Sequence, residues 1–315
     1  MSSALAFAIA AFFMGLLFGS FLNVCISRLP LRESIIKPRS HCPRCGHSIR
    51  WYDNIPLVSW ITLRARCRDC GAKIPWRYPL VELATGLWFG NTWLLTWVRS
   101  GNEHNGQVGA WMNERIMDQY FLGVSIIILG FLLIGLLVMD WQTHTLPDVF
   151  TLPGIAIGFF LICIQAIFLG PDEAAIKLDP SHSLRMSSPG SFIAKGNVFL
   201  TGAEHLVFGR VAAIIGAALL PFLIRALYRV IRKRHGLGLG DVKLMAMIAA
   251  FLGFWPAILA FFLGCLFILP YAITLLIRKR ATSATQLPFG SFLAAGGLVA
   301  ALLGTQLIDW YQSLL

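Results

Sequence analysis

Residues 119–140 read QYFLGVSIIILGFLLIGLLVMD, an uncharged and mostly apolar run that ends at Asp140. About 20 apolar residues are enough to cross the hydrocarbon core of a bilayer as an α-helix. The 315-residue chain has the same character throughout, since 57% of it is hydrophobic, 13% is charged and the mean hydropathy is +0.71. A soluble domain carries about 25% charged residues. The composition therefore excludes a soluble, disordered or disulfide-rich secreted chain and predicts an all-α polytopic membrane protein.

Other apolar stretches lie on both sides of this segment. Six have the length of a membrane span, namely 4–27, 80–98, 149–169, 206–230, 256–277 and 288–308. A shorter stretch, 242–255, is ambiguous on its own, because 14 residues do not cross a bilayer easily. The six long stretches and 119–139 predict seven transmembrane helices, and 242–255 is the candidate for an eighth.

The basic residues predict the orientation. Of the 26 Lys and Arg, 11 lie in 28–78, six in 225–243 and three in 278–280. Cytoplasmic loops carry an excess of basic residues, so we expect these three regions in the cytoplasm. The last two can share a side only if 242–255 also crosses, which gives about eight transmembrane helices with both termini outside. The net charge of +11 then reflects cytoplasmic loops and contact with membrane lipid, and no nucleic-acid partner is expected.

This topology divides the chain into three parts. Residues 1–27 form the first transmembrane helix, 28–78 form a small cytoplasmic domain between helices 1 and 2, and 79–315 form a membrane core of helices 2–8. The core includes an outside loop at 170–205, for which the sequence predicts no function.

The small domain contains four cysteines in two pairs, Cys42-Pro-Arg-Cys45 and Cys67-Arg-Asp-Cys70. Each pair is followed by glycine, and 21 residues separate the pairs. Two CxxC knuckles at this spacing predict a Zn(Cys)4 site. Disulfides are disfavoured in the reducing cytoplasm. Four thiolates leave no open coordination position, so the predicted Zn²⁺ is structural and helps a small domain to fold.

Two aspartates at predicted cytoplasmic helix ends are catalytic candidates. Asp140 ends a helix, where the helix dipole disfavours a carboxylate. Asp241 follows the alternating glycines Gly238 and Gly240, which allow the backbone to bend and to approach another group closely. Two carboxyl groups that share one proton are what an aspartic protease needs. We therefore predict Asp140 and Asp241 as a catalytic pair, with Gly238 and Gly240 in support.

Asp148 and Lys243 are further candidates for supporting roles. Asp148 follows Pro147 at a predicted helix start, where the helix dipole alone also favours an acid. Lys243 has a long side chain that can reach the membrane surface. It can also act on the charge of a nearby aspartate.

Several motifs in register resemble one known family. They are GSFLNVCISRLP at 19–30, the two knuckles, WYDNIPLVSW at 51–60, RYPLVE at 77–82, Asp140 with LPD at 146–148, GLGDVK at 238–243 and PFGS at 288–291. The set runs through most of the chain and is similar to the bacterial type IV prepilin leader peptidases, which are polytopic GxGD aspartic proteases.

The resemblance implies a reaction and a location. The family cleaves the basic leaders of prepilins and pseudopilins after a glycine, at the cytoplasmic face of the bacterial inner membrane, and so serves type IV pili and type II secretion. By motif, Asp140 and Asp241 carry over as the catalytic pair. Many members also methylate the new amino terminus with S-adenosylmethionine, an activity associated with the zinc domain; no residue is assigned to that cofactor. This chain departs at Ala65-Arg66, where the family usually has glycine and then a basic residue.

Three other functions remain open at this point. A peptidase without methyltransferase activity is compatible with the departure at Ala65. A proton-coupled transporter could use Asp140 and Asp241 as a relay, although it would be expected to carry acids deeper in its spans. A non-catalytic scaffold could use the zinc domain to hold a pilus or secretion complex.

Overall fold

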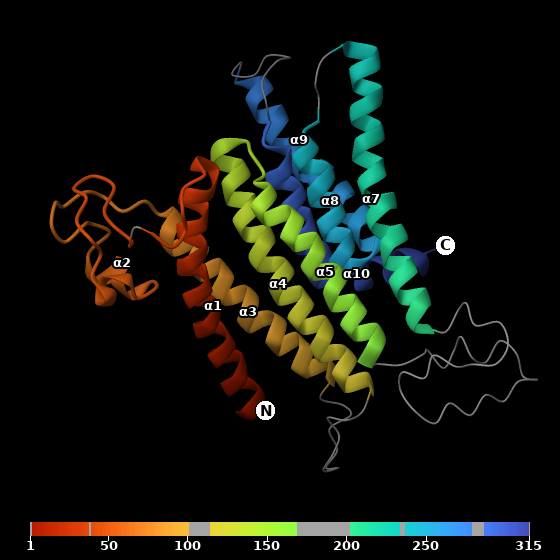
Figure 1. The fold of residues 1–315 in the computed structure, drawn as a ribbon, viewed down its shortest axis with the longest axis horizontal. Helices are drawn as coiled ribbons and strands as arrows, with labels where there is room; N and C mark the ends of the chain where they lie inside the picture. Colours follow the sequence, from red (N-terminus) through yellow and green to blue (C-terminus); the bar gives the residue numbers. More distant parts are fainter. Residues whose placement is uncertain are drawn as a thin grey trace, which may run out of the picture.

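The computed structural model describes residues 2–37, 39–100, 114–168, 202–233, 237–278 and 287–314, and these residues are mainly helical (Figure 1). The long helices are α1 (Ser2–Arg28), α3 (Arg77–Ser100), α4 (Glu114–Thr143), α5 (Asp148–Phe168), α7 (Gly202–Arg232), α8 (Leu239–Leu252), α9 (Phe254–Ile277) and α10 (Phe289–Gln312). The domain beside α1 contains only short helices, namely η1 (Leu29–Leu31), η2 (Trp51–Asn54) and α2 (Val58–Thr62).

Five helical segments of the described residues are long and apolar enough to cross a membrane. They are Ala4–Leu31, Tyr120–Thr143, Asp148–Ala166, Leu206–Ile231 and Phe254–Ile277. Helices α3, α8 and α10 form at the three other predicted spans without meeting the same criterion. The prediction of a helical chain with several membrane spans is confirmed, whereas the number of eight spans is not. The predicted outside loop at 170–205 lies outside the described residues, except that 202–205 already belong to α7.

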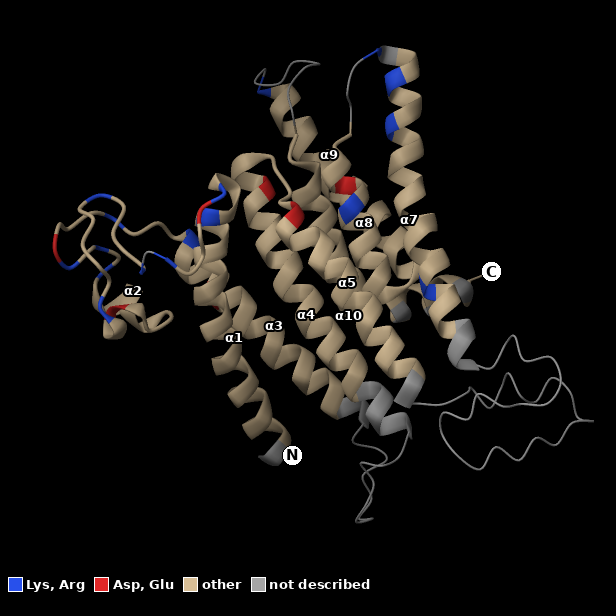
Figure 2. Ribbon diagram, viewed as in Figure 1, with Lys and Arg blue, Asp and Glu red and all other residues tan. Residues whose placement is uncertain are grey.

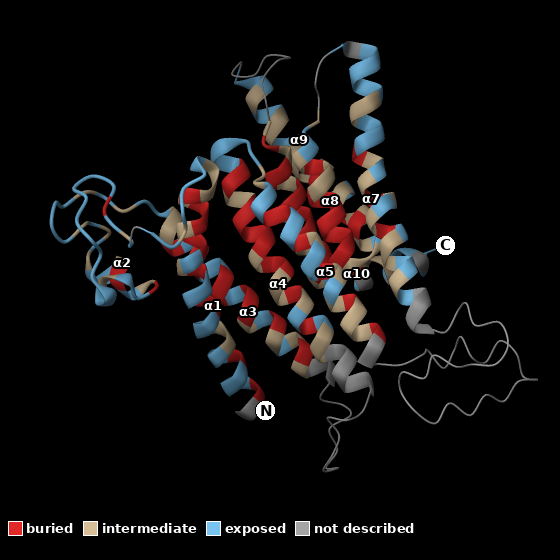
Figure 3. Cartoon of the chain, in the orientation of Figure 1, coloured by how far each residue is buried: buried red, intermediate tan, exposed pale blue. Residues whose placement is uncertain are grey.

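Packing between helices distant in sequence builds the bundle. Helix α1 packs along α3, α10 packs on both α4 and α9, and α8 packs on both α5 and α7. Figure 3 shows that buried residues concentrate in the middle of the bundle. The side chains with no solvent exposure come mainly from α4 and α8, and include Leu129, Leu133, Leu136, Met139, Leu244, Met245, Met247 and Ile248.

Helix α8 is surrounded by the rest of the bundle. Its residues from Leu244 to Phe251 are all buried, as expected for a helix that is apolar on every side. With 14 residues it is about 21 Å long. In its last turn the carbonyl of Ala249 accepts a hydrogen bond from Arg210 Nη1 of α7 at 3.4 Å. Because Asp241 lies in the first turn, the packing of α8 sets the position of that carboxyl group.

Candidate active site and metal centre

Asp140 and Asp241 lie at the same end of the bundle. Asp140 is in the last turn of α4 and Asp241 is in the first turn of α8, and their exposed fractions are 5% and 7%. Their carboxyl groups are close enough to interact electrostatically. Figure 2 shows acidic residues of α4, α5 and α8 gathered at this end. Two carboxyl groups from different halves of the chain therefore share one buried region.

Ser291 of α10 hydrogen-bonds to the Asp140 carboxyl group, a role that the sequence does not predict. Its backbone N–H donates to Asp140 Oδ2 at 2.7 Å, and its hydroxyl lies 3.0 Å from the same oxygen and 3.0 Å from the carbonyl oxygen of Leu137, so that it can donate to either. Because α10 begins at Phe289, the N–H of Ser291 lies in the first turn, and it is shared between Asp140 Oδ2 and the more distant carbonyl of Pro288 at 3.2 Å. The PFGS motif at 288–291 contains the available signal, since a proline at the start of an apolar stretch marks the beginning of a helix.

The backbone passes very close to Asp140 and Leu146. A Cβ atom on Gly290 would lie 3.0 Å from Asp140 Oδ2 and 2.9 Å from Leu146 Cδ1. A Cβ atom on Gly240 would lie 2.9 Å from Leu146 Cβ. The starts of α8 and α10 thus converge on Leu146, and a side chain at either glycine would force them apart.

Gly238 and Arg225 organise the start of α8. The N–H of Gly238 donates to Asp241 Oδ2 at 3.1 Å, which ties the predicted GxGD glycine directly to the carboxyl group. Arg225 of α7 donates from Nη1 to the carbonyl of Leu237 at 3.1 Å and interacts electrostatically with Asp241. The sequence predicts no role for Arg225, because its approach to Asp241 depends on how α7 packs on α8.

Lys243 and Asp148 form an ion pair between α8 and α5. Lys243 Nζ lies 2.6 Å from Asp148 Oδ1, and the two side chains are 32% and 59% exposed. The nearby aspartate with which Lys243 interacts is therefore Asp148. An ion pair this exposed contributes little to stability, about 0–1 kcal/mol.

The four cysteines of the small domain converge on one point. The Sγ atoms of Cys42, Cys45, Cys67 and Cys70 all lie within 4.8 Å of one another, and all four cysteines are free. The Sγ atoms of Cys42 and Cys70 are 3.8 Å apart. Four sulfur ligands at about 2.3 Å around a tetrahedral Zn²⁺ are separated by about 3.8 Å. The cluster therefore fits a structural zinc ion.

The two knuckles have the same backbone geometry. Gly46 (φ 71°) and Gly71 (φ 67°) adopt the left-handed conformation that glycine tolerates. Each donates its N–H to the carbonyl of the first cysteine of its pair, at 2.9 and 3.0 Å. The backbone N–H groups of Cys45 and Arg44 lower the pKa of Cys42 to about 6, whereas burial and the three neighbouring thiols raise the pKa of Cys45, so that Cys42 is the first of the two to form a thiolate.

Ala65 also adopts a left-handed conformation, with φ 56°. Its N–H donates to the carbonyl of Trp60 at 2.8 Å, and its carbonyl accepts from the N–H of Ile74 at 2.7 Å. Glycine takes this conformation without strain, which explains the residue usual in the family at this position. Alanine at position 65 is strained in this left-handed conformation, but both of its backbone hydrogen bonds still form.

Ion-pair and hydrogen-bond contacts tie the small domain together and to the bundle. Arg68 binds Asp53 through two hydrogen bonds, from Nε at 2.9 Å and from Nη2 at 2.6 Å. The Arg68 guanidinium holds the pKa of the Asp53 carboxyl below its usual value. The buried Glu82 of α3 accepts the N–H of Leu57 on Oε2 at 2.8 Å. The last contact links the domain to the membrane bundle.

The fold and the site together define a helical membrane protein that has a buried pair of carboxyl groups at one end and a four-cysteine metal-binding domain at its side. Residues 13–96 match the bacterial peptidase A24 N-terminal domain, and residues 188–273 match the type IV leader peptidase family. With relatives that align over nearly their whole length, this shows that the chain belongs to the type IV leader peptidase family.

Several similar proteins carry the name prepilin leader peptidase/N-methyltransferase. The protein of Pseudomonas aeruginosa is 31% identical and that of Stutzerimonas stutzeri is 30% identical, each over 98% of this chain and 95% of the relative. The protein of Myxococcus xanthus is 37% identical over 80% of this chain, and the match covers 58% of that protein. No solved structure gives a significant match.

Proposed function

We propose that this chain is a membrane aspartic endopeptidase of the bacterial inner membrane. It removes the basic leader of type IV prepilins and pseudopilins after a glycine at the cytoplasmic face. It then methylates the new amino terminus with S-adenosylmethionine. The observation that carries the proposal is the meeting of Asp140 and Asp241 at one end of the bundle. The names of the relatives, which join a leader peptidase to an N-methyltransferase, support the same two activities.

Asp140 and Asp241 share one proton in the proposed reaction. The ionised carboxyl group takes a proton from the attacking water, and the protonated one donates to the oxygen of the scissile carbonyl. Within the described residues, the hydrogen bonds to each carboxyl group fall on its Oδ2 atom, from Ser291 to Asp140 and from Gly238 to Asp241. The two Oδ1 atoms are then the ones that meet water and substrate.

The location at the membrane edge suits the proposed substrate. A basic leader followed by an apolar helix presents its cleavage site where that helix enters the membrane. With eight crossings and both termini outside, the two aspartates share the cytoplasmic side with the basic regions 28–78 and 225–243. Helices α3, α8 and α10 supply the three crossings beyond the five apolar spans.

The cysteine cluster has a structural role in this proposal. Cys42, Cys45, Cys67 and Cys70 would hold one Zn²⁺, which stabilises a domain too small to fold easily alone. S-adenosylmethionine supplies the methyl group when bound.

Mass spectrometry of the substrate tests the proposal. A pilin-like precursor is incubated in detergent with the purified chain and S-adenosylmethionine. We expect loss of the leader and gain of one methyl mass, with cleavage abolished by Asp140→Asn and by Asp241→Asn but not by Glu33→Gln, which changes an exposed carboxylate.

Other results of this assay would favour one of the alternative functions. Full cleavage by either aspartate variant would refute the catalytic pair. Cleavage without the methyl mass would indicate a peptidase that lacks methyltransferase activity. If several pilin-like precursors stayed intact, the scaffold function would replace the enzyme.

A further inference from the structure

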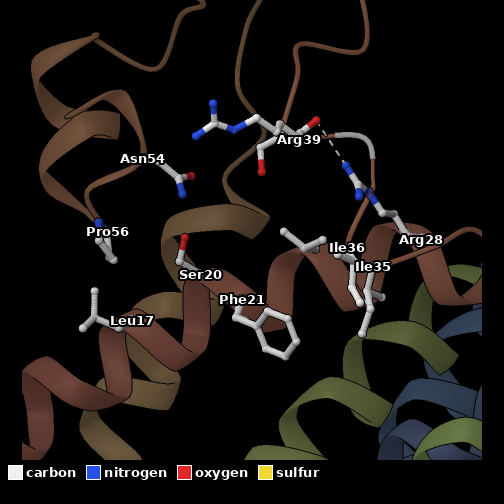
Figure 4. Close-up of a pocket in the computed structure, with 11 residues that line it drawn as sticks. Leu17, Ser20, Phe21, Arg28, Ile35, Ile36, Arg39, Asn54 and Pro56 are labelled. Carbon is white, nitrogen blue, oxygen red and sulfur yellow. Dashed lines mark hydrogen bonds between the residues drawn. The ribbon is translucent and has the colours of Figure 1, made fainter. Parts of the chain in front are cut away.

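A cavity of about 380 Å³ lies between α1 and the small domain, on the side of α1 that faces the domain (Figure 4). Its lining extends along α1 from Leu17 to Arg28 and includes parts of residues 35–40 and 54–56. This stretch of α1 is about 16 Å long, which is about half the thickness of the hydrocarbon core of a bilayer. With α1 crossing the membrane as in the proposed topology, the lining runs from an apolar part of the span at Leu17 to its basic end at Arg28.

The deep part of the cavity is apolar and open to the membrane. Leu17 and Phe21 line it from α1 and are 63% and 46% exposed. Phe13 and Met14, on the preceding turn of α1, are also more than half exposed. These side chains form a continuous apolar surface on α1. A ligand in the cavity could therefore place an apolar chain along this surface of α1.

The other part of the cavity is polar and positively charged. Figure 4 shows the Arg39 side chain reaching across the cavity toward Asn54, with the Ser20 hydroxyl below it. Arg28 is buried and donates from Nη1 to the carbonyl of Ser34 at 3.0 Å and from Nη2 to that of Arg39 at 3.5 Å. Arg28 thus fixes the loop that presents Arg39. No acidic residue occurs among the described residues of the lining.

We propose that this cavity binds one anionic phospholipid. The acyl chain lies on the exposed side of α1 at Leu17 and Phe21, and the headgroup phosphate is bound by Arg39, whose backbone Arg28 holds in place. A guanidinium binds phosphate strongly, because it offers parallel N–H donors with a full charge. A cationic ligand such as the sulfonium of S-adenosylmethionine is disfavoured, because the lining has the exposed charge of Arg39 and no acidic residue. The lipid would fill the space between the domain and the membrane bundle and so hold the domain at the membrane surface.

Native mass spectrometry of the full-length chain in detergent tests the proposal with phosphatidylglycerol and phosphatidylcholine as probes. We expect one phosphatidylglycerol per chain, retained at least about tenfold better than phosphatidylcholine. Arg39→Gln should weaken that binding about fivefold, as expected for one basic residue at a lipid surface. Arg64→Gln removes the same charge from an exposed position outside the cavity and should leave binding unchanged.

A second pair of variants does not depend on arginine. Ile36→Glu places a negative charge in the lining and should abolish the retention of phosphatidylglycerol, whereas Ile61→Glu, at a similarly exposed position elsewhere in the domain, should not. Equal effects within either pair would overturn the proposal. So would equal binding of phosphatidylcholine. Competition by glycerol 3-phosphate at the same concentration would show a phosphate site rather than a lipid site, and displacement by S-adenosylmethionine would assign the cavity to the methyl donor.

Discussion

The carboxyl pair and the cysteine cluster of this chain are built in opposite ways. Each half of the cluster is a short local loop, in which a glycine with positive φ donates to the carbonyl of the first cysteine. The carboxyl pair instead needs α4 and α8 to pack in one bundle, and Asp140 also needs the start of α10. Because one site depends on local turns and metal and the other on long-range packing, each should be removable without the other.

Asp241→Asn should break the carboxyl pair alone and have the largest effect. We expect cleavage to fall by about 10³-fold or more, since the exchange of one shared proton is lost. Zinc content and methylation of a precleaved substrate should stay at the level of the unmodified chain. Rates and metal content are measured on the same preparation, with Glu33→Gln beside it. Loss of zinc together with cleavage would show that the two sites are coupled.

Cys67→Ser should break the metal cluster alone. We expect the single zinc ion to be lost and methyl transfer to fail, while leader cleavage is largely kept, because the domain depends on metal and the bundle does not. Elemental analysis and the substrate mass assay measure both. Cys163→Ser, which changes a free cysteine of α5 outside the cluster, is the control. A variant that kept its zinc would contradict the four-cysteine site.

Ser291→Ala should weaken the carboxyl pair without destroying it. It removes a hydroxyl donor to Asp140 and keeps the backbone N–H donor. A hydrogen bond to a charged group contributes about 1.5–3 kcal/mol, so we expect kcat to fall about 10- to 100-fold with little change in KM. Ser313→Ala on the exposed end of the chain serves as the comparison. An unchanged kcat would show that the Ser291 hydroxyl does not support Asp140 in the reaction.

The ion pair between Asp53 and Arg68 should give the small domain a weak dependence on pH. Because Arg68 lowers the pKa of Asp53, the pair stabilises the domain above the pKa of an unfolded Asp, about 3.9, and this stabilisation disappears as the pH falls through the lower folded value. Asp53→Asn should therefore retain zinc less well than the unmodified chain near neutral pH, and the two should converge in acid.

Zinc retention against a chelator over a pH series measures this difference, which we expect to be the smallest of the four because the pair is partly exposed. Asp69→Asn changes an exposed acid in the same knuckle and is the matched control. Equal zinc retention by Asp53→Asn and the unmodified chain near neutral pH would show that the ion pair does not stabilise the domain.

Local patterns were sufficient to predict most of the helices and the cysteine cluster. The uncharged run 119–139 lies in α4, and the short stretch 242–255 corresponds largely to α8. Apolar length is a property of one continuous segment, and CxxC spacing defines a knuckle within a few residues. The expected number of eight spans is not confirmed, since within the described residues α3, α8 and α10 do not meet the same criterion of length and hydropathy as the other five.

Contacts between distant segments could not be predicted in the same way. The hydrogen bonds from Ser291 to Asp140, the pairing of Lys243 with Asp148 and the cavity beside Arg39 each join parts of the chain that are far apart or that belong to different units. No local spacing encodes such a contact, because it depends on how side chains interlock when the helices pack. The sequence alone therefore predicts which residues carry charge and metal ligands, and the packed structure determines which of them meet.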